Sequence, residues 1–265
     1  MTSHIRHTRG ADSALKRITL GLCLTLLTAC AGGTEPKNAS GIHDPYEDMN
    51  RAVFAFNKVV DRNLLDPVVT GYNTVVPEPA RDGVSNAMRN LREPWTFLND
   101  LLQGNFGRAG TALGRFVINT TLGIGGLFRV SDEMGIKYHN EDLGQTLAVW
   151  GVDRGPYLVL PLLGPSSVRD GAGTVTSFWA DPVSIAADRA NEKGLQLGLV
   201  LTNGLSLRAD NDGLIDSLYQ EDDPYIFMRS TYRQNREFQI RNGKRAKEPS
   251  EADAIFDALE EEDGG

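Results

Sequence analysis

Hydrophobic positions recur at helical spacing along most of the chain. In the first such segment Met49, Val53, Phe56, Val60 and Leu64 follow one another at intervals of four, three, four and four residues, so they share one face of a helix. Such a face is equally typical of a helix packed on a core and of a helix at a membrane interface. Prolines at positions 67, 77 and 94 are expected to separate helices. Further helices are expected at residues 78–92, 94–104, 108–121, 141–150, 166–179 and 223–236.

Three other segments show different patterns. Residues 157–162 are apolar and lie between prolines, which indicates a short strand or an extended segment. Residues 195–201 carry leucine at every second position, yet their flanks are helix-like, so we expect a helix there. Glycines at 123, 125 and 126 indicate a tight bend or close backbone packing, because the phosphate-binding pattern Gly-x-Gly-x-x-Gly fails at Phe128. The predicted fold class is therefore all-α.

The first thirty residues resemble a bacterial export signal. Basic side chains precede an apolar run at 18–27, which is too short to span a bilayer. The run ends in Leu27-Thr28-Ala29-Cys30, the pattern of a lipobox. We expect residues 1–29 to be removed and Cys30 to carry a diacylglycerol and an N-acyl chain, which anchor a protein far more firmly than one chain does. The alternative is an ordinary signal peptide that happens to end near a cysteine.

Composition then divides the remaining chain. Residues 30–43 are small and polar and suit a lipidated flexible tether, 44–243 form the predicted helical domain, and 244–265 are expected to be a disordered acidic tail. After Cys30 no uncharged run reaches 18 residues, so a transmembrane helix is not expected. By analogy with bacterial lipoprotein sorting, Ala31 directs the protein to the outer membrane, anchored on its periplasmic side.

Charge and motifs exclude several functions. A net charge of −8 and a pI near 5.1 argue against nucleic acid as a partner. The chain has no His-Glu-x-x-His, and residues 164–168 miss the Gly-x-Ser-x-Gly pattern at the last position. We therefore expect no catalytic residues, no metal site and no cofactor besides the acyl chains on Cys30.

Short motifs follow one another in order from residue 44 to residue 243. They are Asp44-Pro45-Tyr46-Glu47, Asn50-Arg51, Phe56-Asn57, Asn90-Leu91, Glu93-Pro94, Leu102-Gln103-Gly104, Arg115-Phe116, Asn119-Thr120, Gly123, Gly125-Gly126, Glu141-Asp142, Gly144-Gln145-Thr146-Leu147, Gly155-Pro156-Tyr157, Leu160-Pro161, Gly164-Pro165-Ser166, Arg169-Asp170 and Asp223-Pro224-Tyr225 with Arg229 and Tyr232. In these motifs the chain resembles the MlaA (VacJ) family of outer-membrane lipoproteins. The acidic tail departs from the family, and nothing is carried over to it.

The resemblance implies a specific architecture and function. The family's short amphipathic helices lie in the membrane plane as a ring around a central amphipathic channel. Its members associate with a trimeric outer-membrane porin, remove phospholipids misplaced in the outer leaflet and pass them to a soluble periplasmic carrier of the MlaC type. A polar passage lowers the cost of moving a phosphate through about 30 Å of hydrocarbon. The rival hypothesis is a scaffolding lipoprotein that docks on a porin and has no lipid channel.

Four residues are candidates for a moving part beside that channel. Gly151 and Gly155 flank a polar triplet, a pattern that indicates a hinge or turn, and they match the family's hinge-like segment. Phe56 and Asn57 fall in the N-terminal helical region that the resemblance implicates in control of the channel.

Overall fold

The computed structural model describes residues 44–189 and 193–244, which are mostly helical. They fall into two compact units, one ending at Asp212 and one beginning at Gly213. Cys30, the tether and the acidic tail lie outside the described residues. The first unit contains α2 (Glu47–Val60), the π-helix η1 (Asp61–Leu65), α3 (Asp66–Val75), α4 (Glu78–Leu102), α5 (Phe106–Thr121), α6 (Val130–Glu133), α7 (Leu143–Val149), β1 (Tyr157–Leu160), β2 (Gly164–Ser167), α8 (Val168–Ala180), α9 (Pro182–Arg189) and α10 (Lys193–Asp210).

The second unit is smaller. Helix α11 (Asp212–Gln220) begins at the last residue of the first unit, and α12 (Pro224–Ile240) follows it. Asp223 caps the start of α12, because its carboxylate accepts hydrogen bonds from the backbone N–H groups of Tyr225 and Ile226. Within the described ranges, no helix is both long and apolar enough to cross a membrane.

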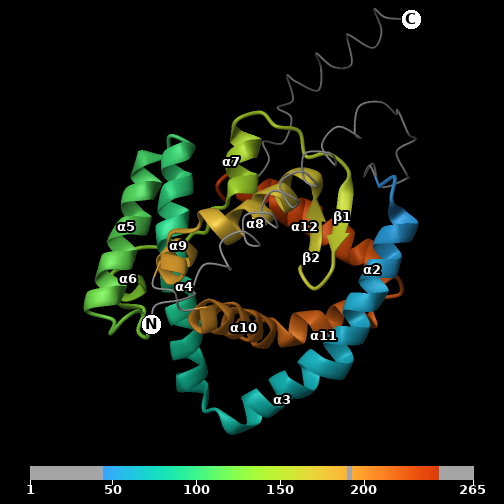
Figure 1. Cartoon of the computed structure of the whole chain (residues 1–265), viewed down its shortest axis with the longest axis horizontal. Helices are drawn as coiled ribbons and strands as arrows, with labels where there is room; N and C mark the ends of the chain where they lie inside the picture. The colour runs from blue at the N-terminus through green and yellow to red at the C-terminus, as the bar shows by residue number, and fades with distance from the viewer. Residues whose placement is uncertain (1–43, 190–192, 245–265) are drawn as a thin grey trace, which may run out of the picture. The chain divides into compact units, whose positions relative to one another are not determined.

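The predicted all-α class needs one correction, because β1 and β2 form a two-stranded antiparallel sheet (Figure 1). Along β1 buried and half-buried side chains alternate, which is the period of a strand. Leu162 lies in the turn that joins the strands and Gly164 begins β2, and their φ angles are positive, 63° and 81°. Strand β1 confirms the extended segment predicted at 157–162, and β2 was not predicted.

Two prolines do not break helices as predicted. Pro67 follows η1, in which the Asp66 N–H bonds to the Asp61 carbonyl five residues back, and the helical path continues into α3. Pro94 lies inside α4, a single helix where two were expected. Proline removes one backbone hydrogen bond from a helix interior. Helix α4 nonetheless continues through it, and α5 packs beside the C-terminal part of α4 (Figure 1).

The interface of α4 and α5 is unusually polar for a protein interior. Ala109 and Ala112 supply its small apolar contacts, whereas Glu93, Asn99 and Arg115 are also almost fully buried. Among the described residues, buried polar and charged side chains outnumber buried hydrophobic ones, and many large hydrophobic side chains are exposed. This distribution is the reverse of the one expected for a protein surrounded by water.

The glycine segment after α5 confirms the predicted close packing. A Cβ atom added at Gly126, whose φ is +93°, would lie 2.5 Å from the Cβ of Asn90 in α4. At Gly123 an added Cβ would lie 2.2 Å from the Phe128 carbonyl oxygen. Only glycine allows the chain to turn this closely against α4.

Candidate functional site

The segment from Gly151 to Gly155 joins α7 to β1. Both glycines have positive φ angles, 86° and 68°, which other residues rarely adopt. A Cβ added at Gly151 would meet nothing within 4 Å, whereas one at Gly155 would lie 3.1 Å from the Cβ of Val168. Gly151 therefore lies in open space, and Gly155 is held against the start of α8.

Both ends of this segment are fixed. At one end the indole N–H of Trp150 donates to the Leu102 carbonyl of α4, 3.0 Å away. At the other end the backbone N–H groups of Val168 and Arg169 donate to the carbonyls of Pro156 and Arg154. The residues between them, in particular Val152 and Asp153, are exposed. The geometry is that of a short exposed loop between two anchored elements.

A charged network fixes α7 to α4 and α5. The Arg108 guanidinium pairs with Glu141 at 2.6 Å, and the Gln103 amide donates to the same carboxylate at 2.9 Å. His139 Nε2 lies 2.7 Å from the buried carboxylate of Asp100. The Thr146 hydroxyl on α7 donates to the Asn99 side-chain oxygen at 2.8 Å. These contacts hold the helix that precedes the loop.

A second ion pair is buried deeper between the same helices. The Arg115 guanidinium, 2% exposed, lies 2.8 Å from the Glu93 carboxylate, 1% exposed, and also pairs with Asp132. It lies 5.3 Å from the centre of the Tyr138 ring, within range of a cation–π contact. Burial raises the pKa of Glu93, and the neighbouring Arg115 opposes that rise.

Helix α2 is bound to the free edge of β1 by two asparagines. Asn50 Nδ2 donates to the Tyr157 carbonyl at 3.0 Å, and its Oδ1 accepts from the Val159 N–H at 2.9 Å. Asn57 repeats the arrangement, because its Nδ2 donates to the Leu160 carbonyl at 3.0 Å and its Oδ1 accepts from the Leu162 N–H at 2.8 Å. Each side-chain amide therefore pairs with the strand edge as a peptide group would.

The structure thus brings together some of the predicted site residues. Asn57 contacts the hairpin that begins two residues after Gly155, so the N-terminal helix and the loop meet through β1. Phe56 is 52% exposed and takes no part in these hydrogen bonds. Asn50 was missed as a site residue, although its place seven residues before Asn57, two helical turns away on the same face, was a usable signal.

A third junction joins the N-terminal helices to α10. Arg208, 6% exposed, pairs with Asp61 of η1 at 2.7 Å and with Asp212. Within the described ranges, no group of three or more His, Cys, Asp or Glu side chains is placed to hold a metal ion. The site consists of hydrogen-bonded helices and an exposed loop.

Comparison with known proteins identifies the family. The model of the MlaA lipoprotein family matches residues 42–239. This chain belongs to the MlaA lipoprotein family. The intermembrane phospholipid transport system lipoprotein MlaA of Escherichia coli is 36% identical over 259 residues, covering 94% of this chain and 98% of the relative. The protein of the same name in Haemophilus influenzae is 34% identical, covering 86% of this chain and 91% of the relative.

A solved structure supports the same assignment. It is described as a structural basis for maintenance of bacterial outer membrane lipid asymmetry, and it matches with a TM-score of 0.65 at 33% identity. The match covers 74% of this chain and 98% of that one. The MlaA fold is therefore shared over most of the described residues.

Proposed function

We propose that this chain is an outer-membrane lipoprotein that removes phospholipids from the outer leaflet and passes them to a soluble periplasmic carrier, which maintains the lipid asymmetry of that membrane. Family membership carries the proposal, because the relatives from Escherichia coli and Haemophilus influenzae are named as lipoproteins of intermembrane phospholipid transport. Cys30 holds the lipid anchor on the periplasmic side, and a trimeric porin is the expected partner in the membrane.

The distribution of side chains supports a body that lies in lipid. Large apolar side chains such as Phe106, Leu113 and Val117 of α5 are 73%, 46% and 50% exposed, and they recur at helical spacing. Contact of such a surface with lipid tails costs no free energy, whereas its contact with water is unfavourable. The buried polar networks then lie between the helices, away from the lipid. A ring of these helices in the membrane plane around an amphipathic channel follows as part of the proposal.

The loop at residues 151–155 is the proposed moving part. It is short, exposed and rich in glycine, it lies between fixed ends, and its neighbour β1 is tied to α2 by Asn50 and Asn57. A shift of the loop would reach α2 through those four hydrogen bonds. Movement of such a loop is the usual means of opening and closing a passage.

Deleting the gene tests the function directly. The expected result is a rise in outer-leaflet phospholipid and a cell that is more sensitive to detergent with EDTA, both restored by the wild-type gene. No described element is a nucleotide-binding loop, so net flow would be set by the excess of outer-leaflet lipid and by uptake into the carrier. Unchanged outer-leaflet phospholipid in the deletion strain would contradict the proposal and favour the scaffolding alternative.

A further inference from the structure

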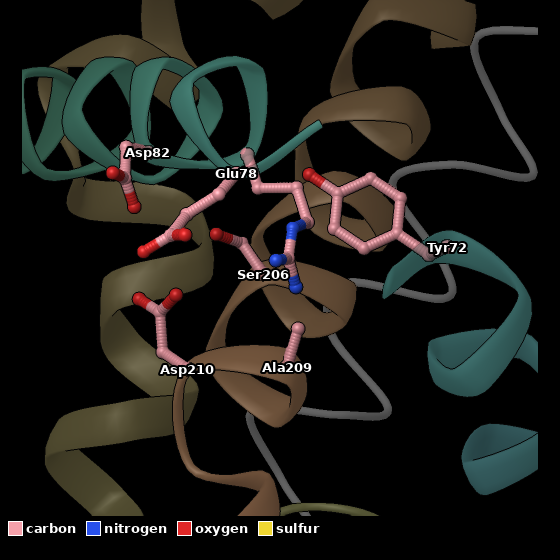
Figure 2. Close-up of a pocket in the computed structure, with 7 residues that line it drawn as sticks. Tyr72, Glu78, Asp82, Ser206, Ala209 and Asp210 are labelled. Atoms are coloured by element: carbon pink, nitrogen blue, oxygen red, sulfur yellow. The ribbon is translucent and has the colours of Figure 1, made fainter. Parts of the chain in front are cut away.

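A small pocket of about 160 Å³ lies where α3, α4 and α10 meet. It is lined by Tyr72, Glu78, Arg81, Asp82, Ser206, Ala209 and Asp210. Figure 2 shows the carboxylates of Glu78, Asp82 and Asp210 around the same space as the Ser206 hydroxyl. The volume suits a group of a few non-hydrogen atoms, and the lining carries three negative charges against one positive charge.

Several polar groups in this lining have unused hydrogen-bonding capacity. Ser206 is only 4% exposed, and no partner of its hydroxyl is seen among the described residues. Glu78 and Asp82 form no ion pair within the same part of the chain. Asp210 is partly engaged, because its Oδ2 accepts from Ser85 at 2.6 Å and from Arg89 at 3.3 Å. Of these groups Ser206 is buried, and a buried hydroxyl requires a partner, whereas Glu78, Asp82 and Asp210 reach solvent.

Two hydrogen-bond donors lie at another part of the lining. The Tyr72 hydroxyl and the Arg81 Nε are both buried without a partner in the structure. Burial raises the pKa of Tyr72, so its hydroxyl keeps its proton at neutral pH. Figure 2 shows that hydroxyl directed toward the first turn of α4. The pocket therefore offers acceptors for a cation and donors for an anion in one small volume.

Exposed aliphatic side chains are close neighbours of the lining residues along the chain. Val75, three residues before Glu78, is 80% exposed, and Val68 on the same helix is 49% exposed. Leu207, which follows Ser206, is 41% exposed. A polar pocket whose lining residues have exposed aliphatic neighbours along the chain fits an amphipathic ligand better than it fits a small soluble ion.

We propose that this pocket binds the head group of a phospholipid that ends in a primary ammonium. The ammonium donates hydrogen bonds to Glu78, Asp82 and the Ser206 hydroxyl, and the phosphate oxygens accept from Tyr72 and Arg81. A bare metal ion fits less well, since within the described residues no cluster of three or more His, Cys, Asp or Glu side chains is placed to hold a metal ion. A quaternary ammonium fits less well too, because it has no N–H to donate and prefers an aromatic cage.

This inference rests on the proposed function and names the lipid that it favours. The full-length lipoprotein is purified in micelles that contain equal amounts of phosphatidylethanolamine, phosphatidylcholine and phosphatidylglycerol, and the retained lipids are quantified by mass spectrometry. Wild type should retain the ethanolamine lipid at least about threefold over each of the others, the scale of a partly exposed ion pair. The double variant Glu78→Gln/Asp82→Asn should retain lipids close to the input ratio.

The matched control is Asp48→Asn/Glu133→Gln, which changes the net charge equally at two exposed carboxylates outside the pocket. It should keep the wild-type preference. Circular dichroism checks the fold, and the single variant Asp82→Asn, at an exposed position, replaces the double variant if that one unfolds. Free ethanolamine that binds wild type as tightly as the lipid does would make the pocket a site for a small amine and overturn the lipid assignment.

The outcomes separate this inference from the proposed function. Lipids retained in the input ratio by wild type would overturn the head-group preference alone. Retention of no lipid of any head group would contradict the lipid passage itself. A preference that persists in the double variant would show that the ammonium is recognised elsewhere.

Discussion

Asn57 shows how much one side chain contributes to the connection between α2 and the hairpin. Its amide makes two hydrogen bonds to β1 and the turn after it; the bond to Leu160 is partly buried, and the bond to Leu162 is exposed. Replacement with alanine should lower the free energy of unfolding by about 1–3 kcal/mol, because the Leu160 carbonyl and the Leu162 N–H lose their partner. Thermal unfolding in detergent measures the change.

Two variants provide controls for that measurement. Asn63→Ala removes an asparagine whose amide bonds only to the Val59 carbonyl of its own helical segment, so a smaller loss is expected. Asn57→Asp keeps the acceptor for the Leu162 N–H but loses the donor to Leu160. A loss for Asn57→Ala no larger than that for Asn63→Ala would contradict the role assigned to Asn57.

The buried pair Glu93–Arg115 is expected to be far more sensitive than a surface pair. Glu93→Gln leaves the Arg115 charge almost fully buried with only Asp132 beside it, and this should cost about 3–5 kcal/mol of stability. The exposed pair Arg51–Glu47 provides the comparison, since Glu47→Gln should cost about 0.5 kcal/mol or less. Equal losses measured by denaturant unfolding would contradict the view that this pair orders the core.

At the scale of elements, helices were predicted far better than the contacts between them. The pattern of apolar positions located α5, α8 and α12 within a few residues, because each carries its periodicity locally, and α8 and α12 also carry a capping side chain. Proline effects at positions 67 and 94 were predicted wrongly. A sequence pattern records only the local preference of proline to end a helix. At these two positions the packing of α4 on α5 and the π-turn of η1 outweigh that preference.

The candidate site was only partly predictable for a related reason. The glycines at 151 and 155 carry a local signal, and the structure gives both positive φ angles. The bonds from Asn50 to β1 join residues more than a hundred positions apart, so no window of sequence contains both partners. The pocket beside α10 has the same origin, since its lining comes from residues 72–82 and 206–210.

The loop at 151–155 gives a prediction at this scale. Gly155→Cys with Val168→Cys places two thiols where an added Cβ at 155 lies 3.1 Å from the Val168 Cβ, close to the usual 3.5–4.5 Å of a disulfide. Oxidation should prevent the Gly155 end of the loop from separating from α8 and so stop lipid removal, and reduction should restore it. The outer-leaflet phospholipid of cells that carry the variant is the measurement.

Gly155→Ala and Val168→Cys alone serve as controls, because neither forms the bond. Gly155→Ala reveals any loss of lipid removal caused by a side chain at the positive φ of residue 155. Val168→Cys reveals any loss caused by the smaller side chain at 168. Lipid removal that continues in the oxidised double variant would mean that Gly155 serves packing and that its separation from α8 is not needed.

At the scale of the whole chain, the anchor and the apolar surface are expected to hold the protein in the membrane together. Cys30→Ser removes the proposed acyl chains and should lower, without abolishing, the share of protein found in the outer membrane. Adding Leu113→Asp, at an exposed position of α5, should reduce binding to phospholipid vesicles by about fivefold or more, because a carboxylate is costly in lipid. Vesicle flotation measures the bound share.

The control is Cys30→Ser with Asn140→Asp, which adds the same charge at an exposed polar position. The share of this control that floats with the vesicles should equal the share measured for Cys30→Ser alone. Equal binding by all three variants would contradict the membrane placement of α5. A Cys30→Ser protein that stays fully in the outer membrane and keeps its function would contradict the need for the anchor.

The placement of polar residues inside and apolar residues outside also bears on biogenesis. A nascent chain in water gains little from collapse around Glu93, Asn99 and Arg115, and it gains most from hiding the exposed apolar surface that is proposed to face lipid. Collapse in water, before insertion into the membrane, therefore favours burial of the apolar side chains that are exposed in the final fold. On the proposed placement in lipid, we expect an exported chain of this kind to need a partner that covers its aliphatic faces until it reaches the bilayer.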